Sequence, residues 1–509
     1  MRSTLMATLL LTGSLLCCCR SDRDVSHALV ITSDFNSVRQ CKTVDDVNAV
    51  AHTMMSAKPD ILALDATANG LVNYRSEIGF LIPGSNFDRL FEAGIEPFGM
   101  VVDTLRRHGV TVLANVRMND HHGRLVQWTR WEREHKEWSL AKDTGARDWK
   151  SVGALRQMDY TIEGVRQYRS AILEEILGRF DVDGLQLDFG RTAPFLSEPK
   201  VENARCMTEY VREIRTLLDR TARKRRREKM LLGVVVPWDI DFCTQEGLQV
   251  QQWIERELID YVSPGEWYYA DWNIPLDRWR SMTHGTNCRL YPFTPGNVSP
   301  YQVFEYGEPS LLGDNTVLDP PKIRALADNF MSQNPDGFAF YNFYTFDFGQ
   351  YYPDLRTWTD PQSTKHMSKH YLMCRRLMYH PTERETFDSG VAFKRQLLQK
   401  TGDSVEMPFR FSTNIVDSCA TLRCAFKDMH ETDEIVVRIN GCRVTPDTIE
   451  GRTVQSEGNP DLAVRFWESG ITVPPLELGE NVIQWTLTKR ETDTGKGISV
   501  GEFEIVIVP

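Results

Sequence analysis

Short apolar runs rich in β-branched residues alternate with longer amphipathic stretches from Ala28 to about His380. Such alternation is typical of parallel strands buried on both faces and joined by helices. Eight strands are predicted, at Ala28–Asp34, Ile61–Ala66, Val110–Val116, Gly184–Phe189, Leu232–Pro237, Ile259–Ser263, Arg289–Phe293 and Gly337–Tyr341. Helices are predicted at Val44–Ala57, Thr161–Phe180, Val201–Lys229, Leu248–Glu257, Pro321–Gln333 and Thr364–Tyr379.

This pattern predicts an α/β fold in which the βα units close into a (β/α)8 TIM barrel over residues 26–380. A doubly wound open sheet is the alternative. It is disfavoured because no glycine-rich phosphate-binding loop follows the first strand.

The hydrophobic pattern changes to a period of two after Pro381, as in Glu434–Ile439 and Asn481–Leu487. Turn signals such as Asn440-Gly441 separate these runs, and Val500–Val508 is a further strand candidate. Residues 386–509 are therefore predicted to form an antiparallel β-sandwich, an accessory domain that packs against the barrel.

The first 20 residues have the pattern of an export signal. Leu5 to Leu16 is apolar but too short to span a bilayer comfortably, and Cys17-Cys18-Cys19 follows it directly. A cysteine at this place resembles the acylation site of bacterial lipoproteins, although Ser14-Leu15-Leu16 lacks the usual small residue just before it. We expect export to the periplasm, the outer membrane or the medium. A lipid anchor and plain secretion both stay open. The lipid anchor is the one membrane contact expected.

Composition excludes some partners. The 509 residues include 59 Lys and Arg against 70 Asp and Glu, a net charge of −11, so nucleic acid is not expected as a partner. The basic run 223–227 falls near the end of a predicted helix, where cations complement the helix dipole. Oligomeric state is not addressed by these patterns.

The cysteines beyond the N-terminal three are scattered, and none forms a C-x-x-C pair. Buried free thiols are therefore expected rather than a zinc site or a disulfide framework. One bridge among Cys419, Cys424 and Cys442 stays open.

Polar and aromatic residues follow the predicted strands, where a barrel enzyme keeps its active site. Carboxylates, amides, arginines and aromatic faces together suit a sugar, because hydroxyls need polar partners and the apolar ring face stacks on Trp or Tyr. A carbohydrate is thus the expected ligand. The candidate binding residues are Asp34, Asp65, Asn115, Arg117, Asn119, Asp120, His121, Arg191, Trp238, Asp241, Trp267, Tyr291, Asn342 and Tyr344.

Hydrolysis of a glycosidic bond needs two carboxyl groups that flank it. Asp188 after the fourth strand is our candidate for nucleophile or charge stabiliser, and Glu266 after the sixth is our candidate for general acid and base. Asp239 after the fifth strand is the alternate partner. The adjacent His121 and His122 lack the spacing of a metal site, so neither a metal nor another cofactor is expected.

Each acid also has a structural alternative. Asp188 can form an ion pair with a strand-end arginine, and Glu266 can cap the segment that follows it. Asp239 and Asp241 can serve the N-terminus of the next helix, where Asp is favoured.

The segment from Asp181 to Phe189, with the sequence DVDGLQLDF, resembles the fourth-strand segment of barrel glycosyl hydrolases. It is most similar to that of the family-10-like glycosyl hydrolases, which are TIM-barrel lipoproteins. Leu258–Pro264 resembles the sixth-strand segment of that group, and Val116–Asp120 resembles the third. The resemblance covers roughly residues 28–380 and implies an exported glycoside hydrolase that acts on a polysaccharide or oligosaccharide.

The same strand partly resembles the D-G-x-D-x-D-x-E pattern of family 18 chitinases. Asp183, Gly184 and Asp188 match it, whereas Gln186 replaces the middle acid and Gly190 stands where that family keeps its catalytic Glu. The family 18 mechanism is therefore not expected, because its proton donor is missing. A non-catalytic glycan-binding barrel lipoprotein is the alternative function.

Overall fold

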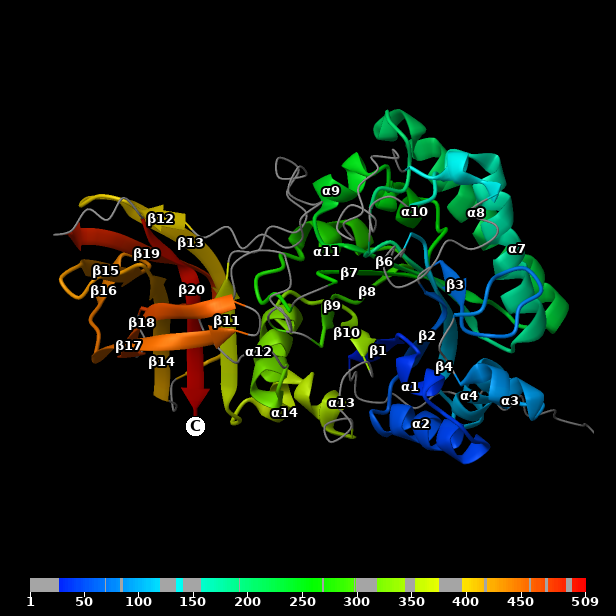
Figure 1. The fold of residues 1–509 in the computed structure, drawn as a ribbon, viewed down its shortest axis with the longest axis horizontal. Helices are drawn as coiled ribbons and strands as arrows, with labels where there is room; N and C mark the ends of the chain where they lie inside the picture. Colours follow the sequence, from blue (N-terminus) through cyan, green and yellow to red (C-terminus); the bar gives the residue numbers. More distant parts are fainter. Residues whose placement is uncertain are drawn as a thin grey trace, which may run out of the picture.

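The computed structural model describes residues 27–68, 70–82, 86–119, 134–140, 157–191, 193–267, 270–296, 298, 318–343, 353–374, 396–415, 419–456, 459–471, 475–490 and 497–509. The proposed signal segment lies outside these ranges. Within them, a closed barrel of parallel strands ringed by helices is followed by a separate body of antiparallel sheets (Figure 1).

Each of the barrel strands lies close to its predicted position. They are β1 (Ala28–Ser33), β2 (Ile61–Ala68), β4 (Thr111–Arg117), β5 (Gly184–Asp188), β6 (Leu231–Pro237), β7 (Tyr261–Gly265), β8 (Arg289–Leu290) with β9 (Phe293–Pro295), and β10 (Gly337–Phe343). The seventh barrel position is divided between β8 and β9. The sheet closes because β1 pairs in parallel with both β2 and β10, which confirms the predicted TIM barrel.

Helices connect these strands around the outside of the barrel. They are α1 (Asn36–Arg39), α2 (Val44–Ser56), α3 (Phe87–Glu92), α4 (Pro97–Arg107), α7 (Glu163–Arg179), α8 (Lys200–Arg225), α9 (Ile240–Gln245), α10 (Val250–Glu255), α11 (Asp277–Thr283), α12 (Pro320–Met331), α13 (Leu355–Trp358) and α14 (Pro361–Thr364). A short strand, β3 (Leu71–Val72), and a 3-10 turn, η1 (Lys136–Trp138), complete this part. The starts follow local chemistry, as at α2, where Thr43 and Asp46 form a capping box.

The helix predicted at Thr364–Tyr379 is wrong. The helix α14 ends at Thr364, and β11 (Lys369–Cys374) is a strand that pairs antiparallel with β20 (Ile498–Val508). A strand partner more than 100 residues later in the sequence decides this structure, and no local pattern reveals it.

The C-terminal part consists of two facing antiparallel sheets, which confirms the predicted β-sandwich. One sheet holds β11, β20, β14 (Cys419–Lys427), β18 (Asn459–Ile471), β17 (Thr448–Ser456) and β12 (Gln396–Leu398). The other holds β13 (Ser404–Phe411), β19 (Gly479–Lys489), β15 (Glu434–Ile439) and β16 (Cys442–Val444). The sheets meet where the Phe503 ring of β20 packs on Phe409 of β13 and Trp485 of β19, with ring centroids 5.0 and 6.0 Å apart.

The β-sandwich lies against α12, whose residues are buried along most of its length (Figure 1). Asp328 of α12 is 5% exposed and accepts bonds from the Lys369 ammonium at 2.6 Å and from the Thr413 hydroxyl. Burial raises the pKa of Asp328, and the Lys369 charge opposes this. Next to it, the Asn329 amide donates to the carbonyl of Arg410 at 2.8 Å. These buried polar contacts connect the barrel to the β-sandwich.

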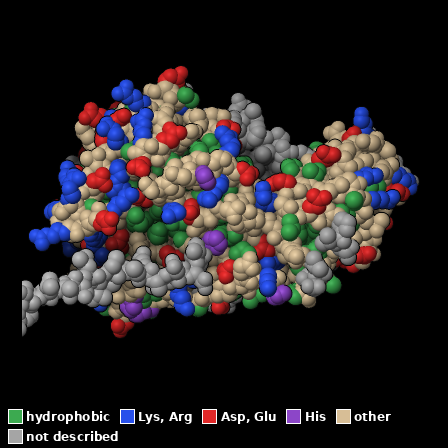
Figure 2. Space-filling view, turned by 180° about the vertical axis from the view of Figure 1, so that it is seen from behind, with side chains coloured by type: hydrophobic (Ala, Val, Ile, Leu, Met, Phe, Trp, Pro, Cys, Tyr) green, Lys and Arg blue, Asp and Glu red, His purple; other side chains and the backbone are tan. Residues whose placement is uncertain are grey.

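The cysteines with described side chains are free thiols, as the sequence predicted, and the bridge left open near the C-terminus is not formed; burial was also predicted, but Cys206 is only partly buried and Cys419 and Cys442 are exposed. They are Cys41, Cys206, Cys243, Cys288, Cys419, Cys424 and Cys442. Within the described ranges, none of the helices has the length and hydropathy to cross a membrane. Figure 2 shows basic and acidic side chains interspersed over the barrel end farthest from the β-sandwich.

At the N-terminal rim of the barrel, an aspartate precedes every second strand and makes the same set of hydrogen bonds. The Asp260 N–H donates to the Leu232 carbonyl, and the Asp260 carboxylate accepts the N–H of that same residue, both at 2.7 Å. The Asp260 carbonyl accepts the Arg289 N–H at 2.9 Å. One residue thus joins β7 to the strands on both sides. We call this arrangement the aspartate clasp.

Three more clasps repeat this geometry. Asp60, Asp183 and Asp336 hold the N–H groups of Leu29, Val112 and Leu290 at 2.8, 3.0 and 2.9 Å. Each clasp also has a cationic partner: Arg356 at Asp60, Arg106 and Arg227 at Asp183, Arg215 and Lys229 at Asp260, and Arg289 at Asp336. Arg227 belongs to the basic run 223–227, so part of that run serves the rim.

We expect Asp260→Ala to lower the free energy of unfolding by about 2–3 kcal/mol, because it leaves the Leu232 N–H without its acceptor and Arg215 without its carboxylate. Urea denaturation measures this loss. Asp103→Ala, at an exposed position of α4, is the control and should change stability by less than about 0.5 kcal/mol. Equal losses in both variants would show that the clasp adds nothing to the backbone ladder.

We expect Lys369→Met to lower the free energy of unfolding by about 3–5 kcal/mol, because it leaves the Asp328 carboxylate buried without its charge partner. The double variant Asp328→Leu with Lys369→Met should recover much of this loss, since no buried charge then remains unpaired. Denaturation monitored by fluorescence measures both. A double variant no more stable than Lys369→Met would contradict a charge-based explanation.

Candidate functional site

The inner wall of the barrel becomes polar toward its C-terminal rim. The apolar part is a separate buried cluster of Val30, Ile61, Ala63, Leu113, Val235, Tyr261, Tyr291, Phe293, Ala339 and Tyr341. Residues at i and i+2 of a strand share a face. The next inward positions after Ala63, Leu113 and Gly184 are therefore Asp65, Asn115 and Gln186, which are paired neighbours and fully buried.

Asp188, the last residue of β5, lies one layer closer to the C-terminal rim and is 1% exposed. Its Oδ1 accepts the Gly190 N–H at 2.9 Å, and its Oδ2 accepts the Tyr341 hydroxyl of β10 at 2.5 Å. Burial raises the pKa of Tyr341 well above its usual range, so this phenol remains a donor. The Asp188 carboxylate is thus held from two sides of the barrel.

Arg117, the last residue of β4, connects several polar groups of the rim. One of its terminal nitrogens lies 2.7 Å from Asp65 Oδ2 and donates to Asn342 Oδ1 at 2.6 Å. Its Nε lies 4.0 Å from Asp188 Oδ2. Asn342 has a φ of 51°, in the left-handed region that Asn tolerates better than most residues. Arg117 therefore lies between two carboxylates and the Asn342 amide. The left-handed backbone conformation of Asn342 is typical of functional sites.

Asp65 is fully buried, and burial is the largest of the effects that raise its pKa to about 7. The charges of Asp34 and Asp188 act in the same direction. The Arg117 cation and the hydrogen bond from Asn115 act in the opposite direction. A buried carboxyl that titrates near neutral pH is typical of functional sites.

A chain of hydrogen bonds crosses the barrel interior to reach Asp65. The Tyr261 hydroxyl donates to Gln186 Oε1 at 2.6 Å, Gln186 Nε2 donates to Asn115 Oδ1 at 2.8 Å, and Asn115 Nδ2 donates to Asp65 Oδ1 at 2.5 Å. Gln186 therefore replaces an acid of the chitinase-type pattern with an amide whose donor and acceptor sides are both used. We call these four residues the amide chain.

Gly233 makes room for the first member of the amide chain. It pairs with Tyr261 across the β6–β7 seam, and a Cβ at Gly233 would lie 1.9 Å from the Tyr261 ring. Gly190 is also confined, because a Cβ there would lie 3.0 Å from Val235 Cγ1 and 3.2 Å from Asp188 Oδ1. A glutamate at Gly190 would crowd the backbone N–H that Asp188 uses.

Glu266 directly follows β7 and is 2% exposed. The Arg191 guanidinium lies over the Trp267 ring, 4.4 Å from its centroid. Trp267 and Asn342 are partly exposed. The rim therefore offers an aromatic face and an amide beside its buried acids.

Asp239 and Asp241 both interact at the start of α9. The Asp239 carboxylate caps the helix by accepting the N–H groups of Asp241 at 2.8 Å and Phe242 at 3.2 Å. Asp241 forms an exposed two-bond ion pair with Arg278. These contacts match the structural alternative rather than a catalytic pair.

Asn119 and Asp34 bind protein groups. The Asn119 amide donates to the carbonyls of Met158 and Pro194 and accepts the Met158 N–H. It therefore links the segment that follows β4 to the segment that follows β5. Asp34 accepts the backbone and side-chain N–H groups of Asn36. Both contribute to loop structure.

Trp238 and Tyr291 are the remaining aromatic candidates. Trp238 is partly exposed, and its carbonyl accepts the indole N–H of Trp279. The Tyr291 ring packs 5.4 Å from Tyr261 in the apolar cluster, and burial raises its pKa to about 12. Three further candidates lie outside the described residues: Asp120, His121 and Tyr344.

The sequence predictions for binding and catalysis did not include Tyr341, Gln186 or Tyr261. Tyr341 touches an acid 153 residues away, so only strand order brings the two together. One signal was available for Gln186, since a polar residue inside an apolar strand needs a buried partner. Among the described residues, no group of three or more His, Cys, Asp or Glu is placed to hold a metal ion.

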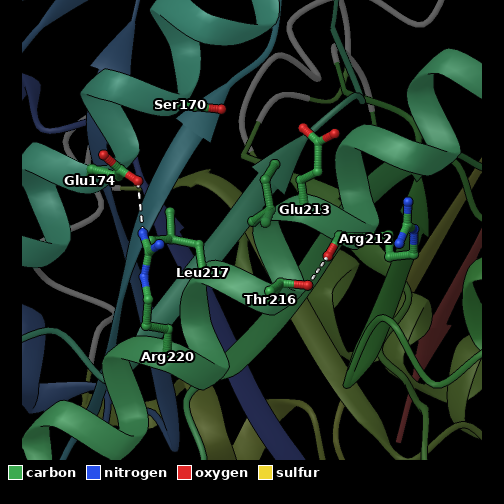
Figure 3. Close-up of a pocket in the computed structure, with 8 residues that line it drawn as sticks. Ser170, Glu174, Arg212, Glu213, Thr216, Leu217 and Arg220 are labelled. Atoms are coloured by element: carbon green, nitrogen blue, oxygen red, sulfur yellow. Dashed lines mark hydrogen bonds and ion pairs between the residues drawn. The ribbon is translucent and has the colours of Figure 1, made fainter.

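A groove of about 390 Å³ lies elsewhere, between α7 and α8 on the outer face of the barrel (Figure 3). An ion pair between Glu174 and Arg220 spans it at 2.8 Å, and Thr216 donates to the Arg212 carbonyl in its wall. Glu174 and Arg220 thus pair within the groove, and Arg212 pairs with Glu209 of the same helix. The C-terminal rim therefore remains the candidate site.

No protein-family model matches the chain, and no curated protein sequence matches it. Similar solved structures include α-L-fucosidase isoenzyme 2 from Paenibacillus thiaminolyticus, with a TM-score of 0.44 and 11% identity over 68% of this chain and 51% of that one. This chain thus spans about half the length of the fucosidase.

Two further similar structures are the maltogenic α-amylase AmyB from Thermotoga neapolitana and a class V chitinase from Nicotiana tobaccum. The amylase has a TM-score of 0.38 and 10% identity over 90% of this chain and 98% of that one. The chitinase has a TM-score of 0.37 and 12% identity over 66% of this chain and 99% of that one.

We expect Gly233→Ala to destabilise the protein by about 1–3 kcal/mol, because its methyl group overlaps the Tyr261 ring. Gly178→Ala in α7 is the control: nothing lies within 4 Å of its Cβ, and alanine should stabilise this helix by about 0.5–1 kcal/mol. Thermal and urea unfolding measure both changes. Equal behaviour of the two variants would contradict the close approach of Tyr261 to β6.

Proposed function

We propose that this protein is a glycoside hydrolase that acts at the C-terminal rim of its barrel. The observation that carries the proposal is the Asp188 carboxylate, which is buried at the end of β5, accepts bonds from Gly190 and Tyr341, and lies beside Arg117. A developing sugar cation must be attacked or stabilised by a negative group. A carboxylate that is held in place and buried from solvent suits this role.

Glu266 is the proposed general acid and base. It follows β7, which is separated from β5 by β6 alone in the sheet. Neighbouring strands lie about 4.8 Å apart, so the two backbones are roughly 10 Å apart. The proposal requires the two carboxyl groups to lie within the ~5–9.5 Å range of glycosidase pairs. Asp239 is the weaker partner, because its carboxylate already caps α9.

Sugar binding is proposed for the more accessible rim groups. The partly exposed Trp267 ring is proposed to stack against an apolar sugar surface, and the Arg191 guanidinium over this ring helps to fix it. The partly exposed Asn342 amide can hydrogen-bond a hydroxyl. Because Asp188 and Glu266 are buried, the proposal requires that the sugar pass the accessible rim groups to reach these two acids.

A panel of polysaccharides and oligosaccharides, assayed for reducing ends, tests the proposal with wild type, Asp188→Asn and Glu266→Gln. We expect each substitution to lower kcat/KM by about 10²–10⁴-fold, because each removes a group that acts in the transition state. Asp277→Asn, at an exposed position of α11, is the matched control and should retain wild-type activity.

Equal activity in wild type and both variants would remove these acids from the mechanism. Binding to a glycan without hydrolysis, measured by calorimetry, would favour the alternative of a glycan-binding barrel. Melting temperatures of all variants separate lost chemistry from lost folding.

A further inference from the structure

Asp65 is a buried carboxyl group that the proposed reaction does not use. It is fully buried one layer farther from the C-terminal rim than Asp188. Its Oδ2 lies 2.7 Å from an Arg117 nitrogen, and the Nε of that same guanidinium lies 4.0 Å from Asp188 Oδ2. Two carboxylates thus share the Arg117 cation in a site that is buried from solvent. Ionising both leaves a net negative charge there, which burial disfavours.

The amide chain determines which oxygen of Asp65 accepts a hydrogen bond. Burial raises the pKa of Tyr261 well above its usual range, so its hydroxyl donates to Gln186 Oε1. The Gln186 amide nitrogen must then face Asn115 Oδ1, and the Asn115 amide nitrogen must face Asp65 Oδ1. Asp65 Oδ1 is therefore an acceptor in either protonation state, and a proton on Asp65 belongs on the Arg117 side.

The charged groups around Asp65 come from several strands. Arg117 on β4 favours its ionised form, whereas Asp188 on β5 and Asp34 after β1 disfavour it. Tyr341 on β10 faces the same cluster through its bond to Asp188. Burial and the two acids outweigh the single arginine, and the Asp65 pKa is raised to about 7.

We propose that Asp65 is a positioning residue for Asp188. Around Arg117, the two acids form a coupled pair that keeps one proton near neutral pH, and Asp65 is the member that carries it. While Asp65 is neutral, the Arg117 charge acts on Asp188 alone and keeps it ionised as a nucleophile. The nucleophilic role of Asp188 rests on the proposed function, whereas the coupling between the acids does not.

The coupling is tested through stability, without a substrate. The folded protein keeps the Asp65 proton up to about pH 7, whereas an unfolded aspartate releases it near pH 4. The folded state therefore binds more protons in this window, and its stability falls as pH rises from about 4 to 7. Urea denaturation from pH 4.5 to 8.5 should show that Asp65→Asn gains stability relative to wild type as pH rises, and that this gain levels off near pH 7.

Repeating the comparison in an Asp188→Asn background tests the pair itself. Removing the Asp188 charge should lower the pH at which the Asp65 difference curve levels off by about one unit, the size of effect expected from a nearby like charge. Asp260→Asn, which changes a barrel aspartate at the opposite rim, is the control and should leave the Asp65 curve in place. If Asp65→Asn does not fold, a stability loss that ends at a lower pH in Asp188→Asn than in wild type supports the pair.

A flat difference curve for Asp65→Asn, or a curve that levels off at the same pH in the Asp188→Asn background, would overturn the inference. With an active substrate, a kcat/KM transition near pH 7 in wild type that is absent from Asp65→Asn, at unchanged KM, supports positioning; a transition that persists overturns it. Coupled stability curves in a protein that hydrolyses no glycan would leave the pair standing and refute only the proposed function.

Discussion

Closure of parallel strands into a barrel is the constraint on which the rest of this structure depends. Closure collects every strand start on one rim and every strand end on the other. At the first rim the four aspartate clasps tie each second strand to its two neighbours, using carboxylates that also meet arginines and a lysine. Polar groups at this rim therefore contribute to stability, whereas the proposed site lies at the opposite rim.

The same closure buries polar groups inside the barrel. The amide chain and the acids Asp65 and Asp188 lie there, at a desolvation cost that hydrogen bonds and Arg117 partly offset. Arg117 is central because it serves Asp65, Asp188 and Asn342 together. The site's charge balance therefore belongs to a group of residues rather than to a single acid.

The second domain follows a related logic at the outside of the barrel. A barrel helix normally shows one polar face to water, but α12 is buried on both sides, between the barrel and the β-sandwich. Its Asp328 therefore needs Lys369 and Thr413 from the sandwich. Their contacts make the accessory domain part of the folded unit around α12.

The sequence by itself determined the strands, because the wall of a parallel barrel leaves a continuous apolar run that is visible locally. It also placed Asp188, Glu266 and Arg117 at strand ends. Only the tertiary structure decided which of these polar groups meet. Tyr341 reaches Asp188, and Lys369 begins a sandwich strand instead of extending a helix, because the partners lie far away in sequence and are joined by strand order. The capping role of Asp239 was decided by the structure for a similar reason, because capping depends on backbone geometry that composition does not contain.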